Sequence, residues 1–416
     1  MEITRSTEYD RLLARHHAMR LRRQILAPAA PPARTPAGGR PGHPYDGTGD
    51  QRLILRHLEQ VTPFDGLIGH LYDDMFLRRP YLRALFPASM EFQREHLERM
   101  FRYLIEHLHR PDHMTAVLHQ LGSDHRKLGV RPAHYAAFEE ALRAGLRTHA
   151  GPGWSEEAER AWMRMLRFAV GAMVDGAESA LTEPPYWPGT VVGHEPRGRG
   201  TAVLRIRTGE PYPYRAGQYA TVESPLLPHS WRPYSIACAP RADRVLEFHV
   251  RRTGPGGVSE ALVDRTAVGD PVRLGPARGG MTVDGGGRDL LLVAGGTGLA
   301  PMKAIVEELT DRRVRGQRVH LLVGARGRAD LYDWEALAES GPGRPWLDLV
   351  PVLGHDPRPD GRRAMDEALD GRDWSEHLAC VSGPPGMVDA VRTRLLASGL
   401  PADRIRHDPV TTADHG

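Results

Sequence analysis

The spacing of apolar residues changes twice along the chain, and each change marks the border of a region with a different fold class. From residue 51 to about residue 182 the apolar residues recur at helical spacing, as at Leu67, Leu71 and Met75. This spacing predicts amphipathic helices packed into an all-α domain. After Pro184 the runs become short and alternating, as in TAVLRIRT and RVLEFHVRR, with Pro, Gly and Asp between them. That texture is typical of an antiparallel barrel.

From Asp289 onward, apolar runs alternate with glycine loops and helices, as in DLLLVAG, GTGLAPMKAIVEEL and VHLLVGA. Continuous apolar strands are buried on both faces, so the pattern predicts an α/β domain built on a parallel sheet. The predicted organisation is therefore multidomain. An all-α domain at residues 51–182 precedes an antiparallel β-barrel at residues 186–282 and an α/β parallel-sheet domain at residues 283–416.

Residues 1–50 differ in composition from these three domains. Residues 1–26 allow a weakly amphipathic helix, whereas residues 27–50 are so rich in Pro and Gly that they bury too little surface to offset their ordering entropy. We expect a disordered or weakly helical extension and linker. Two alternatives stay open for this segment, namely contact with a partner or surface, and simple solvation.

The composition excludes several classes of protein. Cys238 and Cys380 are the only cysteines, too few for a disulfide framework or a Cys-rich metal centre, and free thiols favour a reducing, cytoplasmic location. The 55 basic residues, of which only Lys127 and Lys303 are lysine, are nearly balanced by 52 acidic residues. This balance gives no electrostatic drive toward nucleic acid. No apolar run approaches the ~18 residues that span a bilayer, so we expect no transmembrane segment.

A glycine-rich motif, GGTGLAPM at residues 295–302, follows an apolar strand and opens an apolar helix. Its glycines let the backbone approach a pyrophosphate at the helix N-terminus, although a plain tight turn explains the motif equally well when it is taken alone. Two further motifs stand on either side of it, RPYS at residues 232–235 and SGPPGM at residues 382–387.

Together with GQY at residues 217–219, these motifs resemble the ferredoxin–NADP reductase family over about residues 186–410. The resemblance implies that the barrel binds FAD, with Tyr234 packed on the isoalloxazine, Arg232 on a flavin phosphate and Ser235 near the flavin N5. It also implies that GGVS at residues 256–259 caps a helix at the FAD pyrophosphate, for which a generic glycine turn is the alternative. The expected FAD-binding residues are Tyr219, Arg232, Pro233, Tyr234, Ser235, Gly257, Val258 and Ser259.

On the nucleotide side, the same resemblance implies NAD(P)H as the hydride donor. Arg326 would hold an adenosine ribose or a 2′-phosphate, which leaves NADH and NADPH both open. The expected contacts are Gly295, Gly296, Thr297, Gly298, Arg326, Gly383, Pro384, Pro385, Gly386 and Met387. Two positions depart from the family pattern: Ser382 stands where many relatives carry Cys, and Val410 stands where an aromatic often covers the flavin. We expect Cys380 to serve in packing.

Four segments of the helical region resemble the globin half of flavohaemoglobins, in order and spacing, over about residues 55–182. They are LIGHLYDDMF at residues 67–76, PYLRALF at 80–86, QREHL at 93–97 and LGSDHRKLGVRPAHYAAFEEAL at 121–142. The resemblance implies haem b with His125 as the axial iron ligand, Phe86 wedged against the haem, and Gln93 and Leu97 on the distal wall. A neutral imidazole suits iron, and its other ring nitrogen can donate to a backbone carbonyl.

Catalytic roles follow from the same resemblance. Tyr72 and Gln93 are expected to hold the oxygen ligand, because a phenol in an apolar stripe needs a hydrogen-bond partner. Tyr135 and Glu178 are expected to form a proximal relay with the axial histidine. Counting from Trp162, however, the family's glutamate position falls on Ala177, and a slip of one residue turns a side chain about 100° around the helix.

Other residues near the expected ligand depart from the family or compete with it. Asp124 stands beside His125 where well-known members carry a lysine. His119 and His134 are the competing candidates for the iron ligand.

The combined resemblance implies an NAD(P)H-dependent nitric oxide dioxygenase. Electrons would pass from NAD(P)H through FAD to haem. At the haem, the small molecules O2 and NO would react to give nitrate. Two alternatives stay open. The first is a haem-based oxygen or redox sensor, or an oxygen carrier, with an attached reductase. The second is a haem-free flavin reductase whose helical domain docks a partner redox protein.

Overall fold

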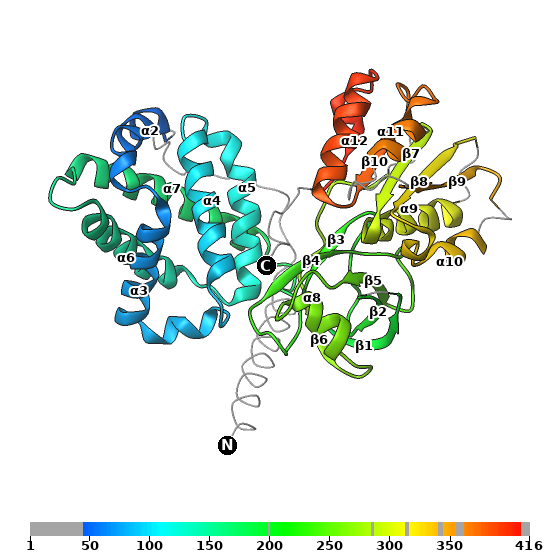
Figure 1. The fold of residues 1–416 in the computed structure, drawn as a ribbon. Coiled ribbons are helices and arrows are strands. Elements are labelled where there is room, and N and C mark those ends of the chain that lie inside the picture. Colours follow the sequence, from blue (N-terminus) through cyan, green and yellow to red (C-terminus); the bar gives the residue numbers. More distant parts are fainter. Residues whose placement is uncertain are drawn as a thin grey trace, which may run out of the picture. The chain divides into compact units, whose positions relative to one another are not determined.

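The computed structural model describes residues 45–198, 200–283, 287–312, 316–339, 344–354 and 362–408. The amphipathic periodicity of the first region produces the predicted helices, shown in blue to green in Figure 1. The helical domain comprises α2 (Gly47–Arg56), η1 (Leu58–Gln60), α3 (Phe64–Arg78), η2 (Pro80–Leu85), α4 (Glu91–His107), α5 (Pro111–His125), η3 (Arg126–Leu128), α6 (Pro132–Ala150) and α7 (Glu156–Ser179).

The helical domain begins earlier than the sequence predicts. Residues up to Asp50 were expected in the linker, but α2 starts at Gly47. Asp50 is buried and accepts hydrogen bonds from Arg164 of α7, with an Nε–Oδ2 distance of 3.0 Å. This ion pair and the burial of Ile54 hold α2 on the domain, whereas residues 1–44 of the predicted extension lie outside the described residues.

Helices α5 and α7 cross so closely that glycine is required on both. A Cβ on Gly122 of α5 would lie 1.8 Å from the carbonyl oxygen of Met173, and one on Gly176 of α7 would lie 2.2 Å from the carbonyl oxygen of His119. The two backbones are therefore in direct contact. This crossing fixes the last turn of α5, which ends at His125.

The second region forms an antiparallel sheet with the strand order β4-β3-β6-β1-β2-β5. A bridge between Ile236 and Phe248 joins the end of β4 to β5, so the two edges of the sheet meet as the predicted barrel requires. Its elements are β1 (Trp187–Pro196), β2 (Thr201–Thr208), β3 (Tyr219–Glu223), β4 (Trp231–Ser235), β5 (Val245–Arg251), α8 (Val258–Glu260), the π-turn η4 (Ala261–Arg265) and β6 (Pro271–Leu274).

The third region forms the predicted parallel sheet, with the strand order β11-β10-β7-β8-β9. Its elements are β7 (Leu290–Gly295), η5 (Gly296–Gly298), α9 (Leu299–Arg312), β8 (Val319–Ala325), η6 (Arg328–Asp330), α10 (Trp334–Glu339), β9 (Leu347–Leu353), α11 (Arg362–Asp370), β10 (Leu378–Ser382), α12 (Pro385–Ala397), η7 (Ala402–Arg404) and β11 (Ile405–Arg406). Figure 1 shows α9 beside this sheet, with α11 and α12 also packed around it. Leu290 and Leu292 of β7 pack in the same core cluster as residues of α9, whereas Leu291 and Val293 pack with residues of α11 and α12.

A buried ion-pair network joins the barrel to the parallel-sheet domain. Lys303 of α9 places its Nζ 2.7 Å from Oε1 of Glu247 on β5 and 3.2 Å from Oδ2 of Asp333. Glu247 also accepts from His249, and these charges hold the pKa of its carboxyl well below the usual range even though burial opposes ionisation. The pairing compensates carboxylates that would be costly to bury alone.

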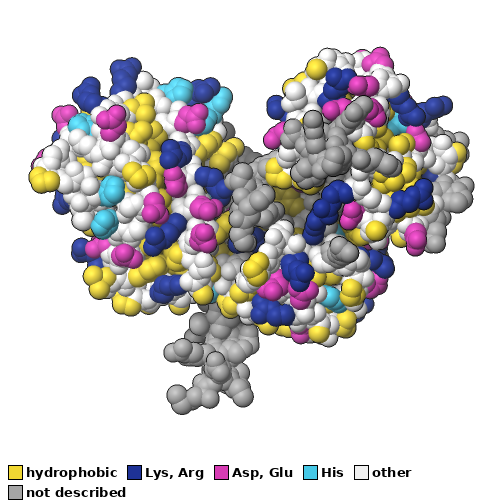
Figure 2. Space-filling view, in the orientation of Figure 1, with side chains coloured by type: hydrophobic (Ala, Val, Ile, Leu, Met, Phe, Trp, Pro, Cys, Tyr) yellow, Lys and Arg dark blue, Asp and Glu magenta, His cyan; other side chains and the backbone are white. Residues whose placement is uncertain are grey.

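None of the helices in the described residues is long and apolar enough to cross a membrane. On the visible face of the helical domain, basic and acidic side chains are interspersed, as Figure 2 shows. That face therefore carries no large patch of one sign of charge.

Candidate functional site

His125 stands at the end of α5 with its imidazole oriented by the backbone. Its Nδ1 donates to the carbonyl oxygen of Leu121 at 2.8 Å, which leaves Nε2 as the nitrogen with a free lone pair. Burial lowers the pKa of His125, so the imidazole is held neutral. A neutral, oriented imidazole is the form that ligates iron.

Three aromatic side chains from two elements meet where the distal pocket is expected. Tyr72 of α3 is buried, and its ring lies 5.7 Å edge-on from Phe86 and 5.9 Å from Phe76. Burial raises the pKa of Tyr72 well above its usual range, which keeps the hydroxyl protonated as a hydrogen-bond donor. Phe86 follows η2, so the structure brings these two predicted residues together.

Gln93 and Leu97 lie one turn apart on α4, and both are half-buried. The Oε1 atom of Gln93 is buried and has no hydrogen-bond partner among the described residues. Because a buried amide oxygen normally finds a partner, this orphan marks a place where a ligand group is expected.

The two residues predicted for the proximal relay differ in burial. Tyr135 of α6 is half-buried, and burial raises its pKa. Glu178 instead lies exposed near the end of α7, so the prediction that it joins His125 and Tyr135 is wrong. The physical reason is the one-residue slip: the half-buried position on that turn is taken by Ala177. The Leu121 carbonyl serves as the observed partner of the imidazole.

His134 is occupied elsewhere. Its Nδ1 accepts from the backbone N–H of Arg131 at 3.2 Å and caps the start of α6. The competing assignment of His134 as iron ligand therefore loses support.

His96 is a residue in this region that the sequence analysis did not select. Its side chain is exposed on α4, and the pKa of His96 is lowered chiefly by loss of solvation, with further contributions from Arg99 and His125. Its ring stacks on Phe92 one turn earlier, with 6.0 Å between the ring centres. The sequence signal that could have selected His96 is its place within QREHL, the segment that resembles the distal helix.

The predicted FAD residues lie mainly on a strand pair at one edge of the barrel sheet. Tyr219 of β3 pairs with Ser235 of β4, and Tyr234 and Arg232 follow along β4, with Pro233 exposed between them. The Arg232 guanidinium bonds the carbonyl of Trp231 and lies 4.3 Å from the ring centre of Phe92. None of the described carboxylates forms an ion pair with Arg232, so its charge suits a phosphate.

The GGVS motif caps a short helix, as predicted. Gly257 precedes α8, and Val258 and Ser259 are both buried. The Ser259 hydroxyl accepts from the backbone N–H of Thr253 at 3.2 Å. Ser259 thus ties the loop together. Because the Gly256 N–H already donates to Oε2 of Glu260 at 2.6 Å, the part of the motif left for a pyrophosphate is the backbone at Gly257.

The two nucleotide motifs interlock at the carboxyl ends of β7 and β10. A Cβ on Gly298 would lie 2.2 Å from the carbonyl oxygen of Ser382, and one on Gly295 would lie 2.5 Å from Sδ of Met387. Gly296 has a φ of +54°, and the Arg251 guanidinium of β5 lies against it. Thr297 belongs to the same turn. The carboxyl ends of the strands are where parallel α/β sheets bind dinucleotides.

The remaining predicted nucleotide residues also follow strands of the parallel sheet. Gly383 and Pro384 precede α12, and Pro385, Gly386 and Met387 form its first turn. Arg326 follows β8, is exposed and lies 3.7 Å from the Asp330 carboxylate. Cys380 of β10 is fully buried, and burial raises its pKa to about 12, as a packing role requires. Val410 lies outside the described residues.

Asp408 is a second residue that the sequence analysis did not select. It follows β11, and a Cβ on Gly279 would lie 2.7 Å from its Oδ1 and 3.1 Å from the Tyr219 ring. That Oδ1 is buried without a partner among the described residues, and burial raises the pKa of Asp408 to about 6. A single Asp in a tail segment offers no periodic signal by which it could have been found.

The raised pKa of Asp408 predicts a pH-dependent gain of stability in the Asp408→Asn variant. The unfolded chain ionises near pH 4 and the folded chain near pH 6, so folding loses stability as pH rises through this window and carries a constant cost above it. We expect Asn to add about 1–3 kcal/mol at pH 8 and roughly half as much at pH 5. Chemical unfolding at both pH values measures the free energy of unfolding of the variant and of the wild type. A variant that is less stable than the wild type at pH 8 would contradict the prediction.

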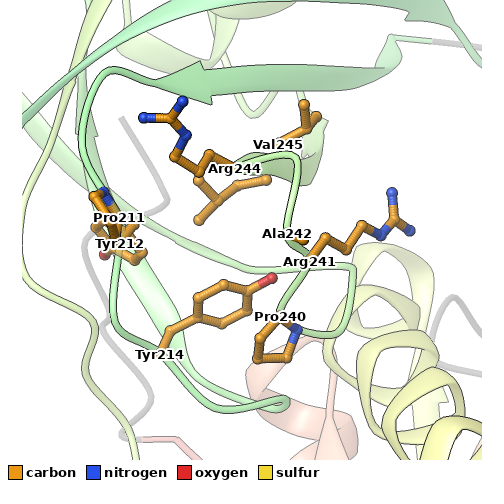
Figure 3. Close-up of a pocket in the computed structure, with 9 residues that line it drawn as sticks. Pro211, Tyr212, Tyr214, Pro240, Arg241, Ala242, Arg244 and Val245 are labelled. Atoms are coloured by element: carbon orange, nitrogen blue, oxygen red, sulfur yellow. The ribbon is translucent and has the colours of Figure 1, made fainter.

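A pocket of about 350 Å³ lies away from all the predicted residues, between the β4–β5 hairpin and the segment before β3 (Figure 3). Tyr214 contributes its ring, but its hydroxyl already donates to the Ala239 carbonyl at 2.7 Å. Arg241 pairs with Glu307 at 3.1 Å. These polar groups are satisfied within the protein, so we assign no ligand to the pocket.

Two family models match the chain. The globin model matches residues 69–173, and the oxidoreductase NAD-binding domain model matches residues 292–393. The first match contains Tyr72, Gln93 and His125, and the second contains both nucleotide motifs.

Curated relatives match about half of the chain. The reductase subunit of an aromatic O-demethylase from Amycolatopsis sp. is 35% identical over 52% of this chain and 66% of the relative. The ferredoxin–NAD(P)+ reductase component of the naphthalene 1,2-dioxygenase system from Pseudomonas putida is 31% identical over 56% of this chain and 72% of the relative. The chain belongs to the family of ferredoxin–NAD(P)+ reductases. In this reductase, a globin domain precedes the shared part.

The whole arrangement also has a solved counterpart. A flavohaemoglobin from Malassezia yamatoensis, with bound FAD and haem, covers 87% of this chain and 98% of its own at a TM-score of 0.69 and 17% identity. The fold of this globin-linked reductase is thus the flavohaemoglobin fold, and the predicted order of globin, barrel and parallel-sheet domains is confirmed. The expected cofactor classes, haem for a globin and FAD with NAD(P)H for the reductase, agree with these matches.

Proposed function

We propose that this reductase is an NAD(P)H-dependent nitric oxide dioxygenase. The observation that carries the proposal is the oriented neutral imidazole of His125, in a chain that also holds the buried, protonated hydroxyl of Tyr72 and a reductase. When bound, FAD would convert a hydride from NAD(P)H into single electrons and haem would supply the iron at which O2 and NO become nitrate.

The residues present fit these groups. Nε2 of His125 is the one ring nitrogen left for iron, and Tyr72 supplies a protonated hydroxyl on the distal side. Arg232 offers a cation to a flavin phosphate. The backbone cradle formed by Gly295, Gly298 and the loop after β10 would fit a dinucleotide, because a Cβ in it would collide with the opposite loop.

Each of the chain's own residues then has a physical task. His125 orients its ring through Leu121. The Tyr72 hydroxyl and the side-chain N–H of Gln93 would donate hydrogen bonds to the oxygen ligand, where fixed dipoles help most in a dry pocket. Phe86 and Leu97 exclude water. On the reductase side, Tyr234 and Ser235 would position the flavin and the loops at Gly295 and Met387 would position the nicotinamide.

Stopped-flow mixing tests the proposal. The oxygenated, reduced protein is mixed with nitric oxide, and nitrate is measured against haem. We expect the absorption of the oxygenated haem to decay on the timescale that stopped-flow mixing resolves. One nitrate should form for each haem. Slow decay without stoichiometric nitrate contradicts the dioxygenase activity and favours a sensor or oxygen carrier.

A second candidate function has its own support. The oxygenase reductase components are 31–35% identical to this chain, whereas the flavohaemoglobin is 17% identical. This difference favours a reductase that passes electrons to a separate protein, with the globin domain as a docking module. A purified protein without a Soret band after haem supplementation would support that function.

A further inference from the structure

Both lysines of this arginine-rich chain lie in domain contacts. Among 55 basic residues only Lys127 and Lys303 are lysine, and their side chains are 9% and 18% exposed. Lys303 ties the barrel to the parallel-sheet domain through Glu247. Lysine has a compact ammonium, so it fits contacts that the larger, planar guanidinium would not.

Lys127 lies two residues after His125, in η3, and contacts the strands expected to bind flavin. Its Nζ donates to Oγ1 of Thr221 on β3 at 2.9 Å and lies 5.3 Å from the ring centre of Trp231 on β4. On its own side it lies 3.8 Å from Oδ1 of Asp124. One ammonium group therefore connects the segment of the expected iron ligand with β3 and β4.

Gly275 packs closely against the contact between Lys127 and Thr221. A Cβ on Gly275, just after β6, would lie 3.4 Å from both Cδ and Nζ of Lys127 and 2.3 Å from Oγ1 of Thr221. Glycine at this position thus permits the lysine and the threonine to meet. The close packing at Gly275 is an observation separate from the hydrogen bond between Lys127 and Thr221, and both support the same contact.

Two arginines of the barrel complete the junction, which we define as the contacts of Lys127, Arg278 and Arg232 across these two domains. Arg278 donates to Oγ of Ser123 at 3.1 Å and pairs with Asp124 at 3.5 Å. Arg232 lies over Phe92 of α4. Both domains belong to the compact unit that runs from Gly47 to the end of the chain.

We propose that Lys127 is a positioning residue that holds the globin domain against β3 and β4 at the separation required for electron transfer from flavin to haem. The proposal deepens the proposed function and rests on both cofactors being bound. Each reduced flavin would release two electrons singly, each converting one ferric haem to ferrous, with the flavin protons passing to solvent. The rate of such a transfer falls steeply with distance, so a fixed contact between the domains is needed.

The scarcity of lysine makes a direct test possible. Brief acetylation of the native protein, followed by mass spectrometry, reports the accessibility of Lys127 and Lys303 separately. We expect Lys127 to react at least tenfold more slowly than in the unfolded chain. The Thr221→Val and Gly275→Ala variants should speed the acetylation of Lys127 and leave the acetylation rate of Lys303 unchanged. Equal reactivity of Lys127 in the native and unfolded chains would overturn the proposal.

The second test measures electron transfer in the loaded protein. In Lys127→Met, we expect haem reduction by NAD(P)H under carbon monoxide to slow at least tenfold, with ferricyanide reduction by the flavin unchanged. The matched control is Arg160→Gln on the exposed face of α7. Haem reduction at the wild-type rate in Lys127→Met contradicts the proposal.

The two failures are distinguishable. If the wild-type protein binds haem and reduces it but yields no nitrate from nitric oxide, the dioxygenase function fails and the role of Lys127 stands. If nitrate forms normally while Lys127→Met loses nothing, the role of Lys127 fails and the function stands.

Discussion

The Gly122→Ala variant is expected to lose haem binding while its flavin is still reduced by NAD(P)H. The new methyl carbon would lie 1.8 Å from the Met173 carbonyl oxygen, so α5 and α7 must separate by about 1.5 Å to restore ordinary contact distance. The obstructing atoms, the carbonyl oxygen, carbonyl carbon and Cα of Met173, are all backbone, so no rotamer change relieves the collision. We expect a loss of about 3 kcal/mol or more in the stability of the helical domain.

Haem content and ferricyanide reduction, measured on the same preparation, check this prediction. Gly122 lies three residues before His125 on the same helix, so a shift of α5 also displaces the iron ligand. Gly171→Ala on α7 is the matched control, because a Cβ there meets nothing within 4 Å and alanine favours the helix by about 0.5–1 kcal/mol. Full haem content in Gly122→Ala would show that the crossing does not position the ligand.

The Gly298→Ala variant is expected to retain its haem but to bind NAD(P)H more weakly, the reverse of the effect expected for Gly122→Ala. Its Cβ would lie 2.2 Å from the Ser382 carbonyl oxygen and 2.7 Å from the Gly383 nitrogen. The two nucleotide loops would be forced apart, so the backbone at the ends of β7 and β10 would no longer fit a dinucleotide. We expect the KM for NAD(P)H to rise at least ~tenfold, which corresponds to about 1.4 kcal/mol of lost binding.

Dithionite provides the internal comparison for this variant. Because it bypasses the nucleotide site, it should reduce the flavin and haem of Gly298→Ala normally. Gly371→Ala, in an exposed turn with nothing within 4 Å of the new Cβ, should keep the wild-type KM. An unchanged KM in Gly298→Ala would mean that NAD(P)H binds elsewhere.

Periodicity predicted the architecture well because it records burial, and burial defines the layers. The buried run at Leu290 to Val293 specified a strand covered on both faces, and the structure places helices on both sides of it. The glycine motifs were equally informative, because Gly295 and Gly298 lie where the two nucleotide loops are too close together for a side chain.

Properties that depend on contacts between distant segments left no local signal. The partner of Lys127 is Thr221, far away along the chain, and the burial of Asp408 depends on Tyr219 and Gly279. The error at Glu178 has a different origin. The face of a helix on which a residue lies depends on exact spacing. A shift of one position places the Glu178 carboxylate in solvent, whereas Ala177 lies on the half-buried face.

The central claim is that His125 holds iron in a pocket to which the chain's own flavin delivers electrons. The most direct measurement adds NAD(P)H alone to the haem- and FAD-loaded protein under carbon monoxide without oxygen, and compares it with His125→Ala. We expect the wild-type protein to develop the Soret band of the ferrous carbon monoxide complex. His125→Ala should bleach its flavin but develop no such band. Equal haem content and equal haem reduction in the two proteins would contradict the claim.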